Sequence, residues 1–413
     1  MIKKYGFWLV LLLWLIYILS FVDRQIVAVL AAQIRLDLDV SNAQMGLLYG
    51  TAFSFVYAFA GIPMGRLADR WSRKGMIVIG LVVWSSATIA SGFAGSFAAL
   101  ISFRMILGVS QAMLSPAAYA LLAEHFPAEK RARVFSWYAS GIFAGVGLSF
   151  LAGGTVAMNY DWRTAMIAVG IPGLILPPIA WFVIRDKRSD LTDSKPPVVR
   201  ETITQLRFML AKPSLRWHLI GFAALACTGY SVLAFFSTVM NDVFGRPDLI
   251  RNYGWFIFGV AGSVVLAGWI ADRLARKNPA RRYWIGFFAA TAGLPLYYFG
   301  LFADNGLTAL IFLGSAVLIS SSYNGVAAAL IQFYVSDDMR SLAGGLYLFV
   351  ISVAGFGLGP PLTGWLMDVH FTGDYAASHA LFSVIIGCSS MAILAFFMAM
   401  KTYKRDTELA SQA

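Results

Sequence analysis

Two ionisable residues stand side by side inside a long apolar segment near the start of the chain. Asp23 and Arg24 lie within an apolar run that begins near Phe7 and continues past Ala28, and Arg104 lies within another such run. A charge at the centre of a lipid bilayer costs on the order of 3 kcal/mol or more, so such charges usually face a cavity and mark a functional site. A carboxyl group there can bind and release a proton, and the arginines can bind an anion. The alternative is an ion pair that only locks two helices together.

Polar residues around Arg104 are spaced to share one helix face. Arg104, Gly108, Gln111 and Ser115 stand at i, i+4, i+7 and i+11, which places them on one side of a helix. This stripe can supply both a partner for Asp23 and a contact for a polar ligand. Protonation of Asp23 would leave two uncompensated arginine charges and thereby favour an anion. A cationic ligand would fit only if it displaced the proton.

A further set of aromatic and polar side chains lies inside the apolar runs. Three of them recur at i, i+4 and i+8 on one helix face, namely Tyr49, Phe53 and Tyr57. Four more lie in the second half of the chain, namely Tyr230, Tyr323, Asn324 and Tyr347. As a set they predict a substrate-binding cavity with one polar wall and aromatic walls elsewhere. Aromatic stripes also serve as plain packing, and that alternative stays open.

The composition places these residues in a membrane-spanning chain. Of the 413 residues, 59% are apolar and 13% are charged, whereas soluble domains have about 45–50% and about 25%. The apolar excess runs from end to end, which excludes an ordinary soluble enzyme, a disordered protein and a secreted disulfide scaffold. Cys227 and Cys388 both lie in apolar runs, which predicts two core thiols and no metal site. We expect no cofactor.

Twelve apolar segments are long enough to cross a bilayer as helices, which need about 20 residues each. They predict an all-α membrane protein with helices over 7–33, 42–65, 75–95, 97–122, 134–157, 164–184, 217–240, 253–271, 282–302, 306–330, 342–366 and 377–400.

The basic residues indicate which side of the membrane each connection faces. Nearly all of the 32 lysines and arginines fall in alternate connections together with both ends of the chain. The other connections carry only Arg35, Arg163, Arg246 and Arg251. This asymmetry predicts that both termini are cytoplasmic. The net charge of +11 is therefore largely a topology signal, and we expect no nucleic-acid partner.

A ten-residue pattern occurs twice, about half a chain apart. Gly, Ala, Asp, Arg, Arg and Lys recur at the same spacing in 65–74 and in 268–277, each time after the second helix of a half. The repeat predicts two six-helix bundles, over 1–185 and 216–413. The polar stretch 186–215 between them predicts a cytoplasmic linker that ends in a short amphipathic helix.

These motifs resemble those of the major facilitator superfamily. The resemblance rests on the repeated loop and on the spacing of Arg104, Gly108 and Ala112. Three segments resemble Spinster-like members more narrowly, namely Phe21 to Gln25, Ser115 to Ala117, and Phe126 to Arg131. Spinster-like proteins usually have a glutamate at the position of Gln111, which leaves Asp23 as the single candidate for proton coupling. The resemblance implies a monomeric transporter that works by alternating access, with a water-filled pocket reaching Asp23 from either side in turn.

In the resembled superfamily the repeated loop latches the two halves in the outward-open state. The resemblance therefore implies gating roles for Gly65, Asp69, Arg70, Arg73, Asp272 and Arg273. Anchoring at the inner leaflet is the alternative. Gly65 and Gly268 are also expected to let helices approach closely, as small residues do in membranes.

We therefore expect a proton-coupled secondary active transporter of a bacterial inner membrane. Its substrate would be a small organic anion, or an anionic or zwitterionic amphiphile such as a lysolipid. The alternatives are a uniporter or lipid exporter without proton coupling, and a membrane sensor that moves nothing. An enzyme is not expected, because the sequence holds no nucleophile–base set, metal cluster or ATP-binding Gly-rich loop.

Overall fold

The computed structural model describes residues 2–186, 199–276, 278–335 and 339–410, and this part of the chain is helical throughout, with no strand. The first group of helices comprises α1 (Ile2–Val29), α2 (Ala31–Leu38), α3 (Asn42–Gly46), η1 (Leu47–Thr51), α4 (Ala52–Arg70), α5 (Arg73–Ser91), α6 (Phe97–Gln111), α7 (Leu114–His125), α8 (Ala128–Leu148), η2 (Ser149–Gly153), α9 (Gly154–Asn159) and α10 (Trp162–Val183). We call it the N-terminal group.

The second group follows a connecting helix, α11 (Val199–Ala211). It comprises α12 (Pro213–Thr238), η3 (Val239–Val243), η4 (Pro247–Asn252), α13 (Tyr253–Ala275), η5 (Pro279–Arg282), α14 (Tyr283–Leu301), α15 (Gly306–Ser320), α16 (Asn324–Ile331), η6 (Gln332–Tyr334), α17 (Arg340–Val350), η8 (Ile351–Phe356), α18 (Gly359–Val369) and α19 (Ala376–Ala410). We call it the C-terminal group. The expected amphipathic helix of the linker is α11.

Side-chain caps fix where several of the long helices begin. Ser72, Ser96, Asp161 and Asn305 each accept a hydrogen bond from the main-chain N–H three residues on, at the starts of α5, α6, α10 and α15. Such caps satisfy donors that the first turn of a helix leaves free. Apolar runs of spanning length follow each cap, and most expected helix ends agree with the observed ones to within a few residues. The exceptions include α8, which begins at Ala128 instead of 134, and α19, which ends at Ala410 instead of 400.

Eleven helical segments of the described chain are long and apolar enough to cross a membrane. The expected span over 42–65 is helical from Asn42 to Arg70 but is not among these eleven. Four expected helices are also interrupted. The first breaks at Leu30 between α1 and α2, and the fourth breaks after Gln111 between α6 and α7. The tenth breaks over 321–323 between α15 and α16, and the eleventh breaks over 357–358 between η8 and α18.

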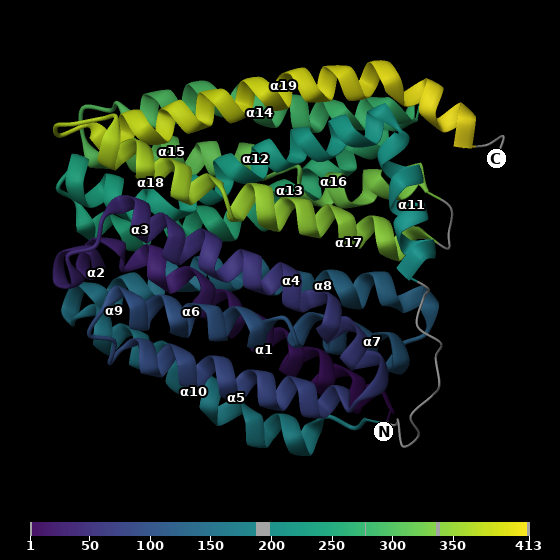
Figure 1. Cartoon of the computed structure of the whole chain (residues 1–413), viewed down its shortest axis with the longest axis horizontal. Coiled ribbons are helices and arrows are strands. Elements are labelled where there is room, and N and C mark those ends of the chain that lie inside the picture. The colour runs from purple at the N-terminus through teal and green to yellow at the C-terminus, as the bar shows by residue number, and fades with distance from the viewer. Residues whose placement is uncertain (1, 187–198, 277, 336–338, 411–413) are drawn as a thin grey trace.

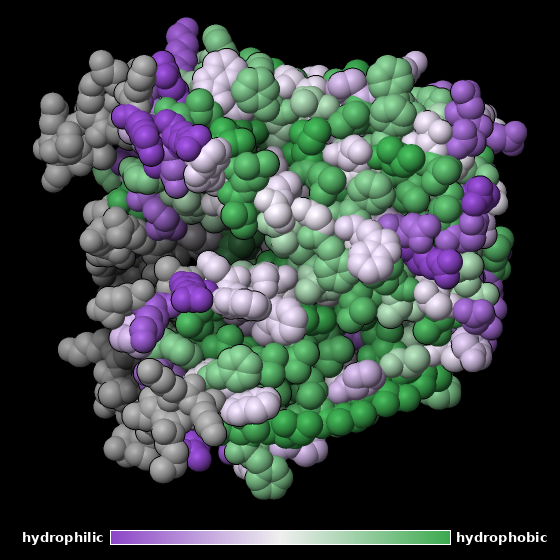
Figure 2. Space-filling model, turned by 180° about the vertical axis from the view of Figure 1, so that it is seen from behind, coloured by the Kyte–Doolittle hydropathy of each residue, from purple (hydrophilic) through white to green (hydrophobic). Residues whose placement is uncertain are grey.

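The two groups lie one beside the other, with their long helices running in the same general direction (Figure 1). The start of α1, the end of α19 and α11 lie at one end of the molecule, which we call the inner end. The opposite end, which carries α2, α3 and α9, is the outer end. Figure 2 shows apolar side chains over the middle of the surface and hydrophilic ones toward both ends, as a membrane-spanning protein requires.

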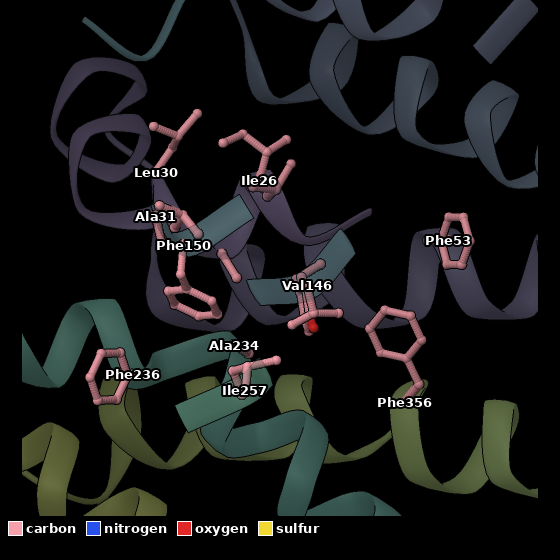
Figure 3. Packing of buried hydrophobic residues seen from close by; sticks show 14 of the residues in the cluster. Ile26, Leu30, Ala31, Phe53, Val146, Phe150, Ala234, Phe236, Ile257 and Phe356 are labelled. Carbon is pink, nitrogen blue, oxygen red and sulfur yellow. The ribbon is translucent and has the colours of Figure 1, made fainter. Parts of the chain in front are cut away.

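The groups pack closely at the outer end. A Cβ on Gly254 of α13 would lie 2.5 Å from the carbonyl oxygen of Gly147 on α8. On the other side of the interface, a Cβ on Gly364 of α18 would overlap the carbonyl of Asn42 on α3. Phe150, Phe236 and Ile257 fill the space between the groups (Figure 3). These glycines permit the close approach that small residues give membrane helices.

The inner end is more open. Phe59 of α4 and Phe349 of α17 meet across the interface with ring centroids 5.7 Å apart, and both helices continue beyond this contact for roughly 14–16 Å at 1.5 Å per residue. A Cβ on Gly65 or Gly268 would meet nothing within 4 Å, so the close approach expected at these two glycines is absent from this structure. Figure 2 shows a hollow between the groups at this end. The structure is therefore closed at the outer end and open at the inner end.

Candidate functional site

Arg104 joins α6 to the main chain of α1. Its guanidinium donates to the carbonyl oxygen of Asp23, with Nη1 at 2.9 Å, and to the carbonyl oxygen of Arg24. Among the described residues, no ion pair within 4.0 Å involves the Asp23 carboxylate. The geometry thus differs from the expected pair, because Arg104 binds the α1 backbone beside Asp23 and not the carboxylate itself.

The side chain of Asp23 turns into the N-terminal group. It is 2% exposed, and its Oδ1 has no hydrogen-bond partner within the described structure. The carboxyl group faces a cavity of about 10 Å³, lined also by Thr88 and Ser91 of α5 and Met166 of α10. This volume holds roughly one water molecule. The cavity lies within the N-terminal group, so Asp23 does not line the space between the two groups in this conformation.

Arg24 turns in another direction, toward aromatic side chains. Its guanidinium lies 4.4 Å from the ring centroids of Phe21 and Phe53 and 4.9 Å from that of Tyr57. Cation–π contacts of this kind stabilise a charge that has left water. Arg24 Nε has no hydrogen-bond partner, and no described carboxylate lies within 4.0 Å of the group. Within the described part of the chain, Arg24 is thus a cation in a membrane span without a carboxylate partner.

Gln111 explains why Arg24 has no counter-ion. Its Oε1 accepts a hydrogen bond from Arg24 Nη2 at 3.1 Å, and its Nε2 donates to the carbonyl of Ser20 at 3.0 Å. A glutamate here would place a carboxylate against Arg24. Glutamine keeps the hydrogen bond and leaves the positive charge available to a ligand. Ser115, which was expected on the same stripe, lies beyond the helix break, on α7.

An aromatic cluster from both groups covers the outer side of Arg24. Phe356 of η8 lies 5.7 Å from Phe53, 4.9 Å from Tyr49 and 4.5 Å from Tyr230, by ring centroids. Figure 3 shows Phe53 and Phe356 facing each other across the interface. The sequence analysis did not predict a role for Phe356. This residue stands between two glycines and has no aromatic residue three or four positions away to mark it. Its position separates the Arg24 site from the outer end.

Two expected cavity residues lie elsewhere. Tyr323 and Tyr347 are 5% and 6% exposed and pack in a separate cluster of the C-terminal group. Tyr323 stacks on Phe222 at 5.3 Å, and Tyr347 lies 6.0 Å from His218. Packing is thus the role that these contacts support for both tyrosines. Asn324 is exposed and donates to the carbonyl of Ser321 at 2.7 Å, on its own segment.

The expected gating residues for which the structure gives contacts touch residues of the same helix group, N-terminal or C-terminal, to which they belong. Arg73 donates to Glu124 at 2.7 Å, and Asp272 pairs with Arg282 at 3.3 Å. Arg273 lies over the ring of Trp269 at 3.4 Å. The side chains of Asp69 and Arg70 lie outside the described part of the structure. In this conformation, open at the inner end, the placed loop residues do not connect the two groups.

Polar contacts at the outer end do connect the groups, and the sequence analysis missed them. The carboxylate of Asp368 on α18 accepts hydrogen bonds from the main-chain N–H groups of Asn42 and Ala43, at 3.1 and 2.7 Å. Arg35 forms an ion pair with Asp242. Thr51 donates to the carbonyl of Gly357 at 2.7 Å. Only the packing of the two groups brings these partners together, so no local pattern could have revealed them.

Comparison with known proteins gives a consistent result. The family model described as the Major Facilitator Superfamily matches residues 13–360. An MFS-type efflux pump of Mycolicibacterium smegmatis is 28% identical, with 94% of this chain and 91% of the relative covered. A hexuronate transporter of Bacillus subtilis is 25% identical, with 94% and 93% covered. Protein spinster homolog 1 of Xenopus tropicalis is 29% identical, with 87% and 72% covered.

One solved structure shares the whole fold. The crystal structure of a bacterial homologue of the human lysosomal transporter Spinster, in an inward-facing and unoccupied conformation, superposes with a TM-score of 0.86. The two chains are 23% identical, and 98% of each is covered. At this identity the likeness establishes the fold alone.

Proposed function

Since the chain belongs to the Major Facilitator Superfamily and is a Spinster-like transporter, not an enzyme, in a bacterial inner membrane, we propose that it moves an organic anion together with protons. We also propose that 42–70 forms a twelfth span, that both termini are cytoplasmic, and that 1–185 and 216–413 are two domains joined by the linker 186–215. The protein would act as a monomer.

The observation that carries this proposal is the uncompensated charge of Arg24. An isolated cation in a membrane span costs on the order of 3 kcal/mol or more. The aromatic rings around Arg24 recover part of this cost. An anion that binds the guanidinium of Arg24 would recover the rest, since an arginine–carboxylate pair is among the strongest polar contacts.

The relatives support an acidic substrate. Hexuronates are sugar carboxylates, and the relative from Bacillus subtilis is a hexuronate transporter. A carboxylate on Arg24, with hydroxyl groups near Gln111 and Tyr57, is the binding mode that we propose. A lysolipid is the second candidate, because Phe53, Phe356 and Tyr230 form an apolar wall beside the same arginine.

Asp23 would couple the anion to protons through Arg104. Arg104 holds the two carbonyl oxygens of α1 next to Asp23. When Asp23 is ionised, its charge offsets one of the two arginines. Protonation removes this offset, so the site attracts an anion more strongly, and by linkage the bound anion favours the protonated form. Proton and anion would then cross together.

The test is anion binding to the purified protein in detergent. We expect D-glucuronate, a hexuronate, to raise the melting temperature of the wild type more at acidic than at alkaline pH. Arg24→Gln should abolish this shift, whereas Arg24→Lys should retain part of it. Arg251→Gln is the matched control, because Arg251 is exposed at the outer end.

Three outcomes decide between the candidates. A rise of the melting temperature with lysophosphatidylcholine and none with D-glucuronate would favour a lysolipid as the substrate. Binding of D-glucuronate that is independent of pH would favour a uniporter. If Arg24→Gln binds either probe as well as the wild type does, the proposed anion site is wrong.

A further inference from the structure

Neighbouring residues on α1 serve two different compartments of the molecule. Successive residues of an α-helix point about 100° apart, and the structure uses this angle to separate Asp23 from Arg24. Arg24 contacts Gln111 and Tyr57, beside the interface of the two groups. Asp23 faces the cavity between α1, α5, α6 and α10. The proposed proton site and the proposed anion site therefore have different surroundings.

The Asp23 cavity is equipped to hold one water molecule. Its volume of about 10 Å³ is near the minimum for a single water, which also needs two to four polar partners. Oδ1 of Asp23 and Nε of Arg104 are buried without partners. The hydroxyls of Thr88 and Ser91 donate to carbonyls of their own helix, at 3.0 and 2.8 Å. Each hydroxyl oxygen can therefore still accept a hydrogen bond from the water.

The cavity lies close to the outer end of the molecule. Ser91 is the last residue of α5, Leu100 is the fourth residue of α6, and Met166 is the fifth residue of α10. One helical turn spans about 5.4 Å, so roughly one turn of each helix separates the cavity from that end. Toward the interface, the backbone of α1 and its two bonds to Arg104 stand between the carboxyl group and the Arg24 site.

The groups that face Asp23 across the cavity are few. Arg104 on α6 contributes a positive charge, and Thr88 and Ser91 on α5 contribute hydroxyl groups. The other lining residues, from α1, η1, α6 and α10, are apolar: Val27, Leu48, Leu100, Leu107 and Met166. No second acid faces Asp23 among the described lining residues. Proton transfer at this point thus involves one carboxyl group, two hydroxyls and a water.

We propose that protons reach Asp23 from the outer face through the N-terminal group, by way of Ser91, Thr88 and one water molecule, and not through the substrate pathway. The Ser91 hydroxyl receives a proton from water at the outer end and gives its own proton to the cavity water, which Thr88 holds in place; this water gives a proton to Oδ1 of Asp23, so only O–H bonds form and break. This inference rests on the proposed proton-coupling role of Asp23.

The test follows the protonation of Asp23 directly, without a substrate. The protein is placed in liposomes with one orientation, and the infrared C=O band of its protonated carboxyl groups is recorded after a pH jump between about pH 9 and pH 3. This range brackets both ordinary and raised carboxyl pKa values. The band that disappears in Asp23→Asn belongs to Asp23. In the wild type, a jump at the outer face should raise this band faster than a jump at the inner face.

The double variant Thr88→Val and Ser91→Ala should slow the rise of the band at least tenfold and leave its final amplitude unchanged. The matched control is Thr363→Val with Ser110→Ala, which removes two buried hydroxyls that also bond to their own helices, at 2.9 Å in each case. Its rate should equal that of the wild type.

Two kinds of result would overturn the inference. The first would reject only the proton route, and the second would also reject the coupling role of Asp23. An unchanged rate in the double variant, or a faster response to the inner face, rejects the route but leaves Asp23 as the coupling residue. If no band assignable to Asp23 appears in the wild type at any pH of the range, the coupling role itself is wrong.

Discussion

A single amide determines what the Arg24 site can bind. Gln111 lies 3.1 Å from Arg24 and offers it an uncharged acceptor. An ionised acid at this position would pair with the arginine. The chain therefore uses a neutral neighbour to keep its cation available, and the sequence alone revealed this residue because it departs from the resembled Spinster-like pattern.

Gln111→Glu should lower the affinity for D-glucuronate by tenfold or more near neutral pH, because a charge-assisted bond to a buried partner contributes about 1.5–3 kcal/mol. Affinity should recover in acid, where a neutral glutamic acid releases Arg24. Titration calorimetry over a pH series measures both effects. Gln111→Met is the control, since it removes the amide without adding charge. Equal binding by wild type and Gln111→Glu at every pH would contradict this account.

Asp37 at the outer end gives a second prediction, on stability. The hydrogen bonds that Arg163 and Trp162 donate to its carboxylate lower the pKa of Asp37. A carboxyl group whose folded pKa lies below its unfolded one stabilises the protein above its ordinary pKa, and this contribution is lost as pH falls through the lowered value. The melting temperature should therefore drop less between about pH 5 and pH 2 in Asp37→Asn than in the wild type. Equal drops would contradict the assignment.

At the scale of the helices, close packing at glycines closes the outer end. Gly46 and Gly364 bring α3 and α18 together, and π-helical turns η1, η2 and η8 lie in three helices of the interface. Such π-helical turns are frequent at functional sites. The sequence pointed to Gly65 and Gly268 for close helix approach, and these two glycines stand apart in this structure. The close contacts lie at Gly254 of α13 and Gly364 of α18.

Gly364→Ala should shift the protein toward the outward-open conformation, because the added Cβ would overlap the carbonyl of Asn42 when the outer end closes. Overpacking costs about 1–3 kcal/mol, which is roughly a five- to 150-fold change in the ratio of the two states. Distances between spin labels at the exposed outer positions Leu36 and Val369 measure this ratio.

Gly387→Ala is the matched control for this experiment. It makes the same substitution on α19, where a Cβ would meet nothing within 4 Å. Its distance distribution should match that of the wild type. If Gly364→Ala also leaves the distribution unchanged, the contact between α3 and α18 does not govern closure.

At the scale of the whole molecule, the sequence was sufficient to predict an all-helical membrane protein of this superfamily. Hydropathy located the helices, and the repeated loop predicts a chain built from two similar halves. The sequence could not predict how α1 is rotated about its own axis. This rotation places Arg24 against Phe53 and Asp23 against Thr88. It depends on how α5, α6 and α10 pack, and because of it Asp23 and the arginines lie in two separate sites and do not form the expected pair.

The central claim is that one carrier couples an anion at Arg24 to a proton at Asp23, and proton movement during substrate uptake tests it most directly. Proteoliposomes loaded with a pH-sensitive dye and held at zero membrane voltage receive a hexuronate gradient directed inward. The account predicts that the lumen acidifies as D-glucuronate enters, and that Asp23→Asn still exchanges labelled for unlabelled D-glucuronate without moving protons. Acidification in Asp23→Asn equal to that in the wild type, or uptake by the wild type with no change of luminal pH, would contradict it.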